Sequence, residues 1–415
     1  MSGKSRPLLI AFITVTLDLL GFGIIIPIQP FYAETFGASP MMVTWLGASY
    51  SLMQFLFVPF WGRLSDRIGR RPVILTSVAL GVIGYVIFGL ANSLLLLFAA
   101  RMLSGFGNAN IATAQAIIAD TTTGAERTKG MGLIGAAFGL GFIFGPALGG
   151  FLGQFGLAAP AFGAAVLGII NFVFAFFMLP ETRPANAPET VRVAPWAILP
   201  ELMKRKNFVR IVVILGVMTT GFALMEQALG LYIERIWVPE ALILEGEAQA
   251  TALRHAAALT AYFLVVVGVT ATIVQGGLIG RLSRRFGERP LAIIGLLLIG
   301  LSSALIPVVG GLGEYAAMFP LAILMATGTS LTTPSLNSIL SQTVHADEQG
   351  GALGIGQSAS ALGRVIGPAM SGLLFEFTIV APFYASAILL GVALVIALGI
   401  SVASVGKADP SAHHH

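Results

Sequence analysis

The sequence predicts an all-α membrane protein with twelve transmembrane helices, arranged in two pseudo-symmetric six-helix bundles. Three observations support this fold class: an apolar composition, twelve apolar runs long enough to cross a bilayer, and a repeat between the two halves of the chain. Of the 415 residues, 56% are hydrophobic and 10% are charged, whereas soluble domains average about 45–50% apolar and about 25% charged residues. The 50 glycines agree with this, because helices packed in lipid need small residues where they touch.

The composition also excludes several classes of function. With no cysteine, the chain forms no disulfide and no Cys-ligated metal or iron–sulfur site. The sequence contains no phosphate-cradling loop with lysine, no histidine cluster with metal-ligand spacing and no nucleophile elbow. We therefore expect no enzyme, no cofactor and no metal. The net charge of +4 would suit a nucleic-acid partner only on a soluble domain, and we expect no such partner.

The twelve apolar runs follow from the span length, because a bilayer crossing needs about 20 mostly apolar residues. The runs are 8–33, 43–62, 73–91, 94–118, 131–155, 158–178, 208–233, 256–280, 291–310, 314–340, 352–377 and 380–404. The first run follows Lys4 and Arg6 as a signal peptide would, but it is long enough to span, so we interpret it as a retained first helix.

One long polar connection, rich in proline and charge, separates the sixth run from the seventh. It divides the chain into residues 1–179, an N-terminal six-helix bundle; 180–207, a cytoplasmic linker; 208–406, a C-terminal six-helix bundle; and 407–415, a tail with part of a histidine tag.

The placement of lysine and arginine predicts the orientation, because these residues favour cytoplasmic loops. If the N-terminus is inside, 19 of the 23 lysines and arginines fall on the cytoplasmic side. The four others are Arg101, Arg235, Arg254 and Arg364. We therefore expect a multi-pass protein of the cell inner membrane with both termini in the cytoplasm.

The two halves repeat each other in sequence. The loop Gly62–Pro72 matches the loop Gly280–Pro290 at eight of eleven positions, with Arg284 where the first loop has Asp66. A second set of matches pairs Gly132, Gly141, Gly145 and Pro146 with Gly354, Gly363, Gly367 and Pro368. Because the order is parallel, the halves are expected to be related by an axis along the membrane normal.

Four motifs carry a resemblance to a transporter family. The loop Gly62–Arg71 is similar to the signature between helices 2 and 3, which reads Gly, then Asp-Arg, then Gly-Arg-Arg. The helix 5 antiporter signature is matched by Gly132, Gly141, Gly145, Pro146, Gly149 and Gly150. Two shorter matches are the Arg101–Gly107 segment, which looks like the helix 4 signature, and Asp18 with Pro27 and Pro30, which look like the helix 1 pattern.

On these motifs the chain resembles the major facilitator superfamily, and more narrowly its twelve-helix drug:proton antiporters, which include tetracycline efflux pumps. The resemblance covers residues 8–404. It implies a proton-coupled secondary transporter that exports small amphipathic molecules, either drugs or lipophilic metabolites, by alternating access. The expected partners are a small-molecule substrate, protons and the lipid bilayer, and the expected state is a monomer.

Two alternatives stay open, because a fold alone never fixes a substrate. One is a proton symporter that imports a small metabolite. The other is a lipid-handling protein or a membrane sensor that transports nothing.

Three charged residues inside the runs are candidates for proton coupling. Asp18 lies near mid-membrane, where apolar surroundings favour the neutral carboxyl, so it can carry a proton; the alternative is a permanent pair with an arginine. Glu226 either takes protons, holds a cationic substrate or hydrates a cavity rim. Arg101 keeps its charge, and we expect it to act on Asp18 unless it points to lipid or pins a helix.

Arg364 lies near the middle of its run, where a charge must face a cavity or a partner. We expect it to bind an anionic group or to pair with Glu226 or Asp18. A pocket with apolar walls and few polar anchors suits varied amphipathic ligands. The substrate-binding candidates are Tyr50, Gln54, Asn108, Gln115, Glu226, Gln227, Asn337, Gln357 and Arg364.

The loop after the second run is expected to be a conformational latch. Asp66 is placed where the N-terminus of helix 11 can stabilise it, and Arg70 and Arg71 can meet Asp120. Such contacts would break when the halves rock against each other; the alternative is that the arginines only set topology. The latch residues are Gly62, Asp66, Arg67, Gly69, Arg70, Arg71 and Asp120.

Overall fold

The computed structural model describes residues 5–121, 137, 140, 141, 144–183, 200–344 and 349–400, and in these ranges it is helical, with no strand. Nine of the described helices are long and apolar enough to cross a membrane. This confirms the all-α membrane fold that the composition predicts.

The first half builds its helices with two interruptions that the apolar runs do not show. Its helices are α1 Ser5–Ile25, α2 Gln29–Glu34, α3 Pro40–Ile68, α4 Arg70–Gly89, α5 Leu94–Gly107, α6 Ile111–Thr121 and α8 Ala159–Met178. The first run breaks between α1 and α2 at Pro27, which has no N–H to continue the helix. The fourth run breaks at residues 108–110, between α5 and α6.

The second half keeps its helices more continuous. They are α10 Lys206–Trp237, α11 Gly246–Ile273, α12 Ile279–Phe286, α13 Glu288–Gly310, α14 Met318–Gln342, α15 Gln349–Phe377 and α16 Ala381–Leu398. Short turns join some of them: η1 Pro239–Leu242, the π-helical η2 Val274–Leu278 between α11 and α12, and η3 Tyr315–Ala317. Apart from the breaks in the first and fourth runs and a few residues at run ends, each predicted run is helical where it is described; the fifth run, 131–155, and the last, 380–404, lie partly outside the described residues.

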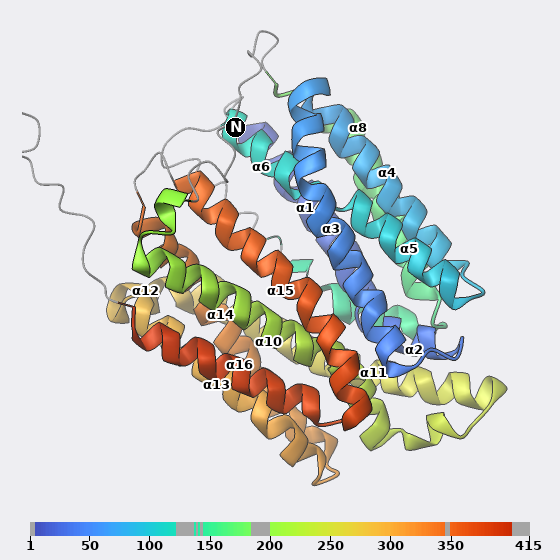
Figure 1. Ribbon diagram of the computed structural model, residues 1–415. Coiled ribbons are helices and arrows are strands. Elements are labelled where there is room, and N and C mark those ends of the chain that lie inside the picture. The colour runs from blue at the N-terminus through green and yellow to red at the C-terminus, as the bar shows by residue number, and fades with distance from the viewer. Residues whose placement is uncertain are drawn as a thin grey trace, which may run out of the picture.

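The helices of each half lie together, and α3 packs along α15 where the halves meet (Figure 1). The molecule has two ends, which we name by what they carry. The α2 end carries α2 and the connection from α10 to α11. The loop end carries the connections from α3 to α4 and from α12 to α13.

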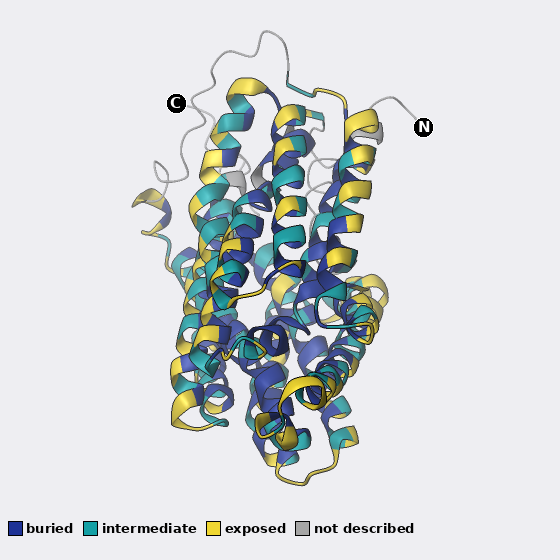
Figure 2. Cartoon of the chain, turned by 90° about the vertical axis from the view of Figure 1, so that its right-hand side faces the viewer, coloured by how far each residue is buried: buried dark blue, intermediate teal, exposed yellow. Residues whose placement is uncertain are grey.

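The two ends differ in how their apolar cores are joined. At the α2 end one cluster of buried residues contains side chains of both halves, among them Ile28, Phe31, Leu229 and Phe263. Among the described residues, the other five clusters are each confined to one half: three belong to the first half and two to the second half. Buried segments are densest in the lower half of Figure 2, away from the labelled chain ends. The halves are therefore fastened to each other at the α2 end.

Candidate functional site

Asp18 on α1 is held by amide groups from two other parts of the first half. Asn110 donates from Nδ2 to Oδ2 of Asp18 at 2.8 Å, and Asn171 on α8 donates from Nδ2 to Oδ1 at 2.8 Å. Asn110 lies in the break between α5 and α6 and also donates to Ser77 on α4 at 2.9 Å. Asn171 also donates to the backbone carbonyl of Thr14 at 3.0 Å. Both carboxylate oxygens of Asp18 thus receive an N–H from a side chain that is itself fixed.

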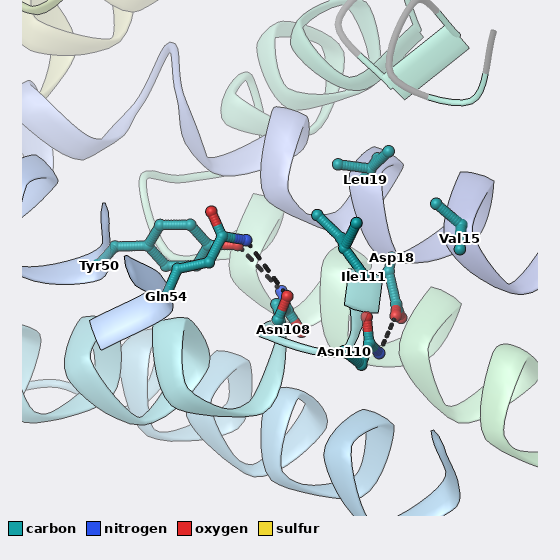
Figure 3. Close-up of a pocket in the computed structure, with 8 residues that line it drawn as sticks. All are labelled: Val15, Asp18, Leu19, Tyr50, Gln54, Asn108, Asn110 and Ile111. Atoms are coloured by element: carbon teal, nitrogen blue, oxygen red, sulfur yellow. Dashed lines mark hydrogen bonds between the residues drawn. The ribbon is translucent and has the colours of Figure 1, made fainter. Parts of the chain in front are cut away.

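A small pocket opens beside this carboxylate (Figure 3). Its lining residues are Val15, Asp18, Leu19, Tyr50, Gln54, Asn108, Asn110 and Ile111. Three of the predicted substrate-binding residues, Tyr50, Gln54 and Asn108, therefore lie in one pocket with Asp18. The lining combines a carboxylate, amides and a phenol with aliphatic side chains.

Hydrogen bonds fix the polar wall of this pocket. Asn108 donates from Nδ2 to the hydroxyl of Tyr85 at 3.0 Å and to that of Tyr50 at 3.4 Å. Gln54 donates from Nε2 to the backbone carbonyl of Asn108 at 3.2 Å. Because that residue begins the break between α5 and α6, its carbonyl and side chain are free to bind residues of α3 and α4.

Arg101 on α5 lies inside the bundle, with 4% of its surface exposed, and not at the lipid surface. Its guanidinium carbon is 4.5 Å from the ring centroid of Tyr50 and 5.6 Å from that of Phe22, and these two rings stack at 4.7 Å. Nε and Nη1 of Arg101 are buried and have no hydrogen-bond partner among the described residues. A desolvated cation over aromatic rings gains about 2 kcal/mol. Arg101 therefore reaches the site through Tyr50, and the lipid-facing alternative is wrong.

The second half contributes Glu226 on α10 and Arg364 on α15. Both side chains are partly exposed, and Arg364 lies within electrostatic range of Glu226 and of Tyr50 across the boundary. Gln227 packs against α3, where a Cβ on Gly47 would collide with its Oε1. Arg364 is thus the residue of the second half that lies near Tyr50, with Glu226 in its range.

Six of the nine predicted substrate-binding residues do not line the pocket around Asp18: Glu226, Gln227 and Arg364, described above, and three others. Gln115 is on α6, Asn337 on α14 and Gln357 on α15, and none of them lines that pocket. Two residues that hold Asp18, Asn110 and Asn171, were not among the predicted site residues. The signal that could have found them is an asparagine inside an apolar run, which must find a hydrogen-bond partner.

At the loop end Arg70 joins three helices of the first half. It is 5% exposed and donates from Nε to Asp120 on α6 at 2.9 Å, from Nη1 to Ser65 at 2.8 Å, and from Nη1 to Asp66 on α3. Of the two arginines expected at Asp120, only Arg70 reaches it in the described contacts. Arg71 instead donates to the backbone carbonyl of Phe176 at 2.6 Å.

The chain after α8 closes the same junction through Glu181. Its carboxylate accepts the backbone N–H groups of Arg70 at 2.9 Å, Arg71 at 3.2 Å, Thr182 at 3.0 Å and Arg183 at 2.9 Å. Partial burial opposes ionisation of Glu181, but these donors outweigh it and lower the pKa of the carboxyl.

The remaining latch candidates surround this junction. Gly69 adopts φ +104°, and a Cβ there would also collide with the Glu181 carboxylate, so glycine is required at this turn. Arg67 is exposed, and its carbonyl accepts from the Arg183 side chain. Gly62 lies one helical turn before Asp66 on α3.

The glycines of the antiporter motif pack against α1. A Cβ on Gly141 would collide with Leu19, one on Gly145 with Gly23, and one on Gly149 with the carbonyl of Ile24. Pro146 lies on the same segment, and a Cβ on Gly150 would collide with Ala261 on α11 of the other half. Gly132 lies outside the described residues. This glycine face therefore sets the distance to the helix that carries Asp18.

Comparisons with known proteins agree with these observations. The family model of the Major Facilitator Superfamily matches residues 11–242 and 248–413. The tetracycline resistance protein of class C from Escherichia coli is 34% identical over 376 residues, 88% of this chain and 89% of that protein. Multidrug resistance protein 1 of Bacillus subtilis (strain 168) is 28% identical over 405 residues, 96% of this chain and 97% of that protein.

Solved structures show the same fold. The crystal structure of the human organic anion transporter MFSD10 matches with a TM-score of 0.68 at 21% identity, covering 96% of this chain and 100% of that one. That of the nucleoside transporter NupG matches with a TM-score of 0.72 at 14% identity, covering 95% of this chain and 98% of that one. The resemblance seen in the sequence motifs is confirmed: this multi-pass membrane protein belongs to the major facilitator superfamily.

Proposed function

We propose that this chain is a proton-coupled secondary transporter that exports small amphipathic molecules by alternating access. The observation that carries the proposal is Asp18, an acid on a membrane-spanning helix that lines a pocket and is held by two amides. The names of the related proteins, which refer to resistance to tetracycline and to many drugs, favour export over uptake.

The surroundings of Asp18 suit a group that gains and loses a proton. The two amide N–H groups stabilise the ionised carboxylate, whereas the aliphatic side chains of Val15, Leu19 and Ile111 favour the neutral acid. Because these influences oppose each other, a ligand entering the pocket changes the balance between the two forms. Proton release from Asp18 is then linked to ligand binding.

The structure gives one state of the proposed cycle. If both termini are cytoplasmic, the α2 end is the outer side, and the cluster of buried residues shared by the two halves closes that side. Among the described residues, the clusters toward the loop end are separate for each half, and none is shared on the cytoplasmic side. We interpret the structure as a state that faces the cytoplasm, and we place the protein in the cell inner membrane as a monomer.

The substrate class follows from the walls of the site. Stacked Phe22 and Tyr50 offer an aromatic surface, and Glu226 and Arg364 offer one charge of each sign from the opposite half. An amphipathic molecule with an aromatic part and a polar or charged group fits this combination.

Vesicles with an acid lumen test the direction of coupling for either orientation of the inserted protein. Purified protein is reconstituted and given a panel of amphipathic drugs and dyes, tetracycline among them. Antiport predicts that substrate accumulates in the lumen as protons leave, and that Asp18→Asn stops this accumulation while Glu240→Gln, an exposed carboxylate at the α2 end, does not. Loss of preloaded substrate along with the protons would show symport, and no movement of any compound would refute a transporter for this panel.

A further inference from the structure

A buried cluster of charges joins the two halves at the α2 end, away from the pocket around Asp18. Arg235 on α10 donates from Nη2 to Oε1 of Glu34, the last residue of α2, at 3.0 Å. Its Nη1 lies 2.8 Å from Oε1 of the neighbouring Glu234. The side chains of Glu234, Glu34 and Arg235 are 1%, 9% and 17% exposed. Arg235 thus contacts two carboxyl groups, one from each half.

The second carboxyl oxygens of Glu34 and Glu234 indicate that a proton is part of this cluster. In the part of the chain that is described, Oε2 of Glu34 and Oε2 of Glu234 are buried and accept no hydrogen bond. The two carboxyl groups also lie within hydrogen-bonding reach of each other. Two ionised carboxylates only accept hydrogen bonds, so such a contact requires a proton on one of them.

The charges lead to the same conclusion. With both acids ionised, the cluster carries one uncompensated negative charge in a buried place, which is costly. Glu34 and Arg235 are the charged groups that act on Glu234. The other charged groups of neighbouring elements point elsewhere: Glu240 on η1 and Glu247 and His255 on α11 are exposed, and Arg254 donates to Thr251.

We propose that Glu34 and Glu234 share one proton when the α2 end is closed, so that Glu34, Glu234 and Arg235 form a second proton-binding site that fastens the outer side of the transporter. This proposal rests on the proposed alternating access but not on the substrate or on Asp18. When the outer side opens, Glu34 leaves Arg235 and Glu234. Both carboxyl groups then meet water, where a glutamate ionises at an ordinary pKa of about 4.3, and the proton returns to the outer medium.

Because the proton is taken from and returned to the same side, this site makes closure of the α2 end depend on pH but carries no proton across the membrane. Closure takes one proton from the outer medium, and opening returns it to the same side. The ratio of closed to open molecules is therefore expected to rise as the outer pH falls, by at most about tenfold per pH unit for one proton. An acidic exterior would therefore favour the state that faces the cytoplasm. Under the same condition protons are driven from the exterior towards the cytoplasm.

The test measures the opening of the α2 end directly. Spin labels on Asn92→Cys and Leu312→Cys, exposed positions of the two halves at that end, report the distance across it over the neutral pH range. The background carries Asp18→Asn and Glu226→Gln, so that these two acids do not contribute. We expect the closed fraction to fall with rising pH.

Matched variants separate the bridge from other titrating groups. In Glu234→Gln the amide can donate to Glu34 and accept from Arg235 without a proton, so the closed fraction should lose its dependence on pH. Glu34→Gln should do the same, and Glu240→Gln should keep the original dependence. A pH dependence in both Glu234→Gln and Glu34→Gln equal to that of the background protein would overturn the proposal.

A second pair of labels distinguishes this failure from a failure of alternating access. Labels on Ile68→Cys and Phe286→Cys, exposed and equivalent positions of the two loops, report the loop end. If they move while the Gln variants keep their pH dependence, only the bridge is refuted. If neither pair moves under any condition, alternating access is refuted and the bridge with it.

Discussion

Arg70 joins α3, α4 and α6 in the first half, whereas the same position of the repeated loop in the second half is Glu288. Arg70 contacts Asp120 at 2.9 Å, and Glu288 accepts from the hydroxyl of Ser338 at 3.2 Å. Ser338 stands as far after Gly280 as Asp120 stands after Gly62. The second half therefore repeats the position of the junction but reverses the charge at its centre and replaces an ion pair by a hydroxyl donor.

The acids on the membrane-spanning helices of the two halves differ in a similar way. Asp18 accepts one hydrogen bond at each oxygen, whereas Glu226 accepts none within the part of the chain that is described and has Arg364 in electrostatic range. A carboxylate fixed at both oxygens is suited to a defined proton exchange. A carboxylate without such partners is available to a ligand. The difference indicates that the first half handles the proton and the second half contributes charge to ligand binding.

The largest expected effect separates these two acids. Asp18→Asn should abolish uphill transport driven by a proton gradient while keeping exchange of labelled for unlabelled substrate, because the alternating movement remains but no proton is released. Glu226→Gln should keep uphill transport of neutral substrates and weaken the binding of cationic ones by about tenfold, or about 1.4 kcal/mol. Flux and binding assays on the same preparations measure both. Equal losses for cationic and neutral ligands in Glu226→Gln would remove the distinction between the acids.

The two loop junctions give the next largest effect. Arg70→Gln removes the guanidinium that contacts Asp66 and Asp120 and should lower the free energy of unfolding by about 2–3 kcal/mol. Glu288→Gln keeps an acceptor for Ser283 and Ser338 and should cost less than about 1 kcal/mol. Thermal denaturation of the purified variants in one detergent gives the comparison. Equal destabilisation would show that the charge reversal between the loops has no energetic consequence.

Sequence reasoning located the helices and several residues of the site, because span length, the loop repeat and isolated charges are visible in the chain itself. The loop motif indicated that Arg70 and Asp120 could meet. The break between α5 and α6 was not predicted, because no proline lies at residues 108–110. The role of Asn110 was therefore not predicted either. The cluster of Glu34, Glu234 and Arg235 was also not predicted, because residues so far apart in the chain are brought together only by packing of the halves.

A smaller effect is expected from the amides around Asp18. Asn171→Ala removes one donor that stabilises the ionised carboxylate, so the proton is held to higher pH and the midpoint of the pH dependence of transport should rise by about one unit. Asn337→Ala, an asparagine of the second half outside the pocket, should leave the midpoint in place. Initial transport rates across a pH series measure both variants. A midpoint that falls or stays in Asn171→Ala contradicts the described hydrogen bond.

The smallest perturbation tests the orientation of both loops at once. The chain has no native cysteine, so Ile68→Cys and Phe286→Cys each introduce a single thiol that can be labelled. Both should react with an impermeant reagent only from the cytoplasmic side, and Leu312→Cys only from outside. Reaction of either loop position in intact cells would reverse the assignment of the α2 end to the outer face.

Proton release on ligand binding tests the coupling most directly. Purified protein in a weakly buffered detergent solution is mixed with a ligand, and the change in pH is recorded together with the amount bound. Antiport at Asp18 predicts that the wild-type protein releases protons as ligand binds and that Asp18→Asn binds ligand and releases none. Release of as many protons by Asp18→Asn as by the wild-type protein would contradict the assignment of Asp18 as the coupling acid.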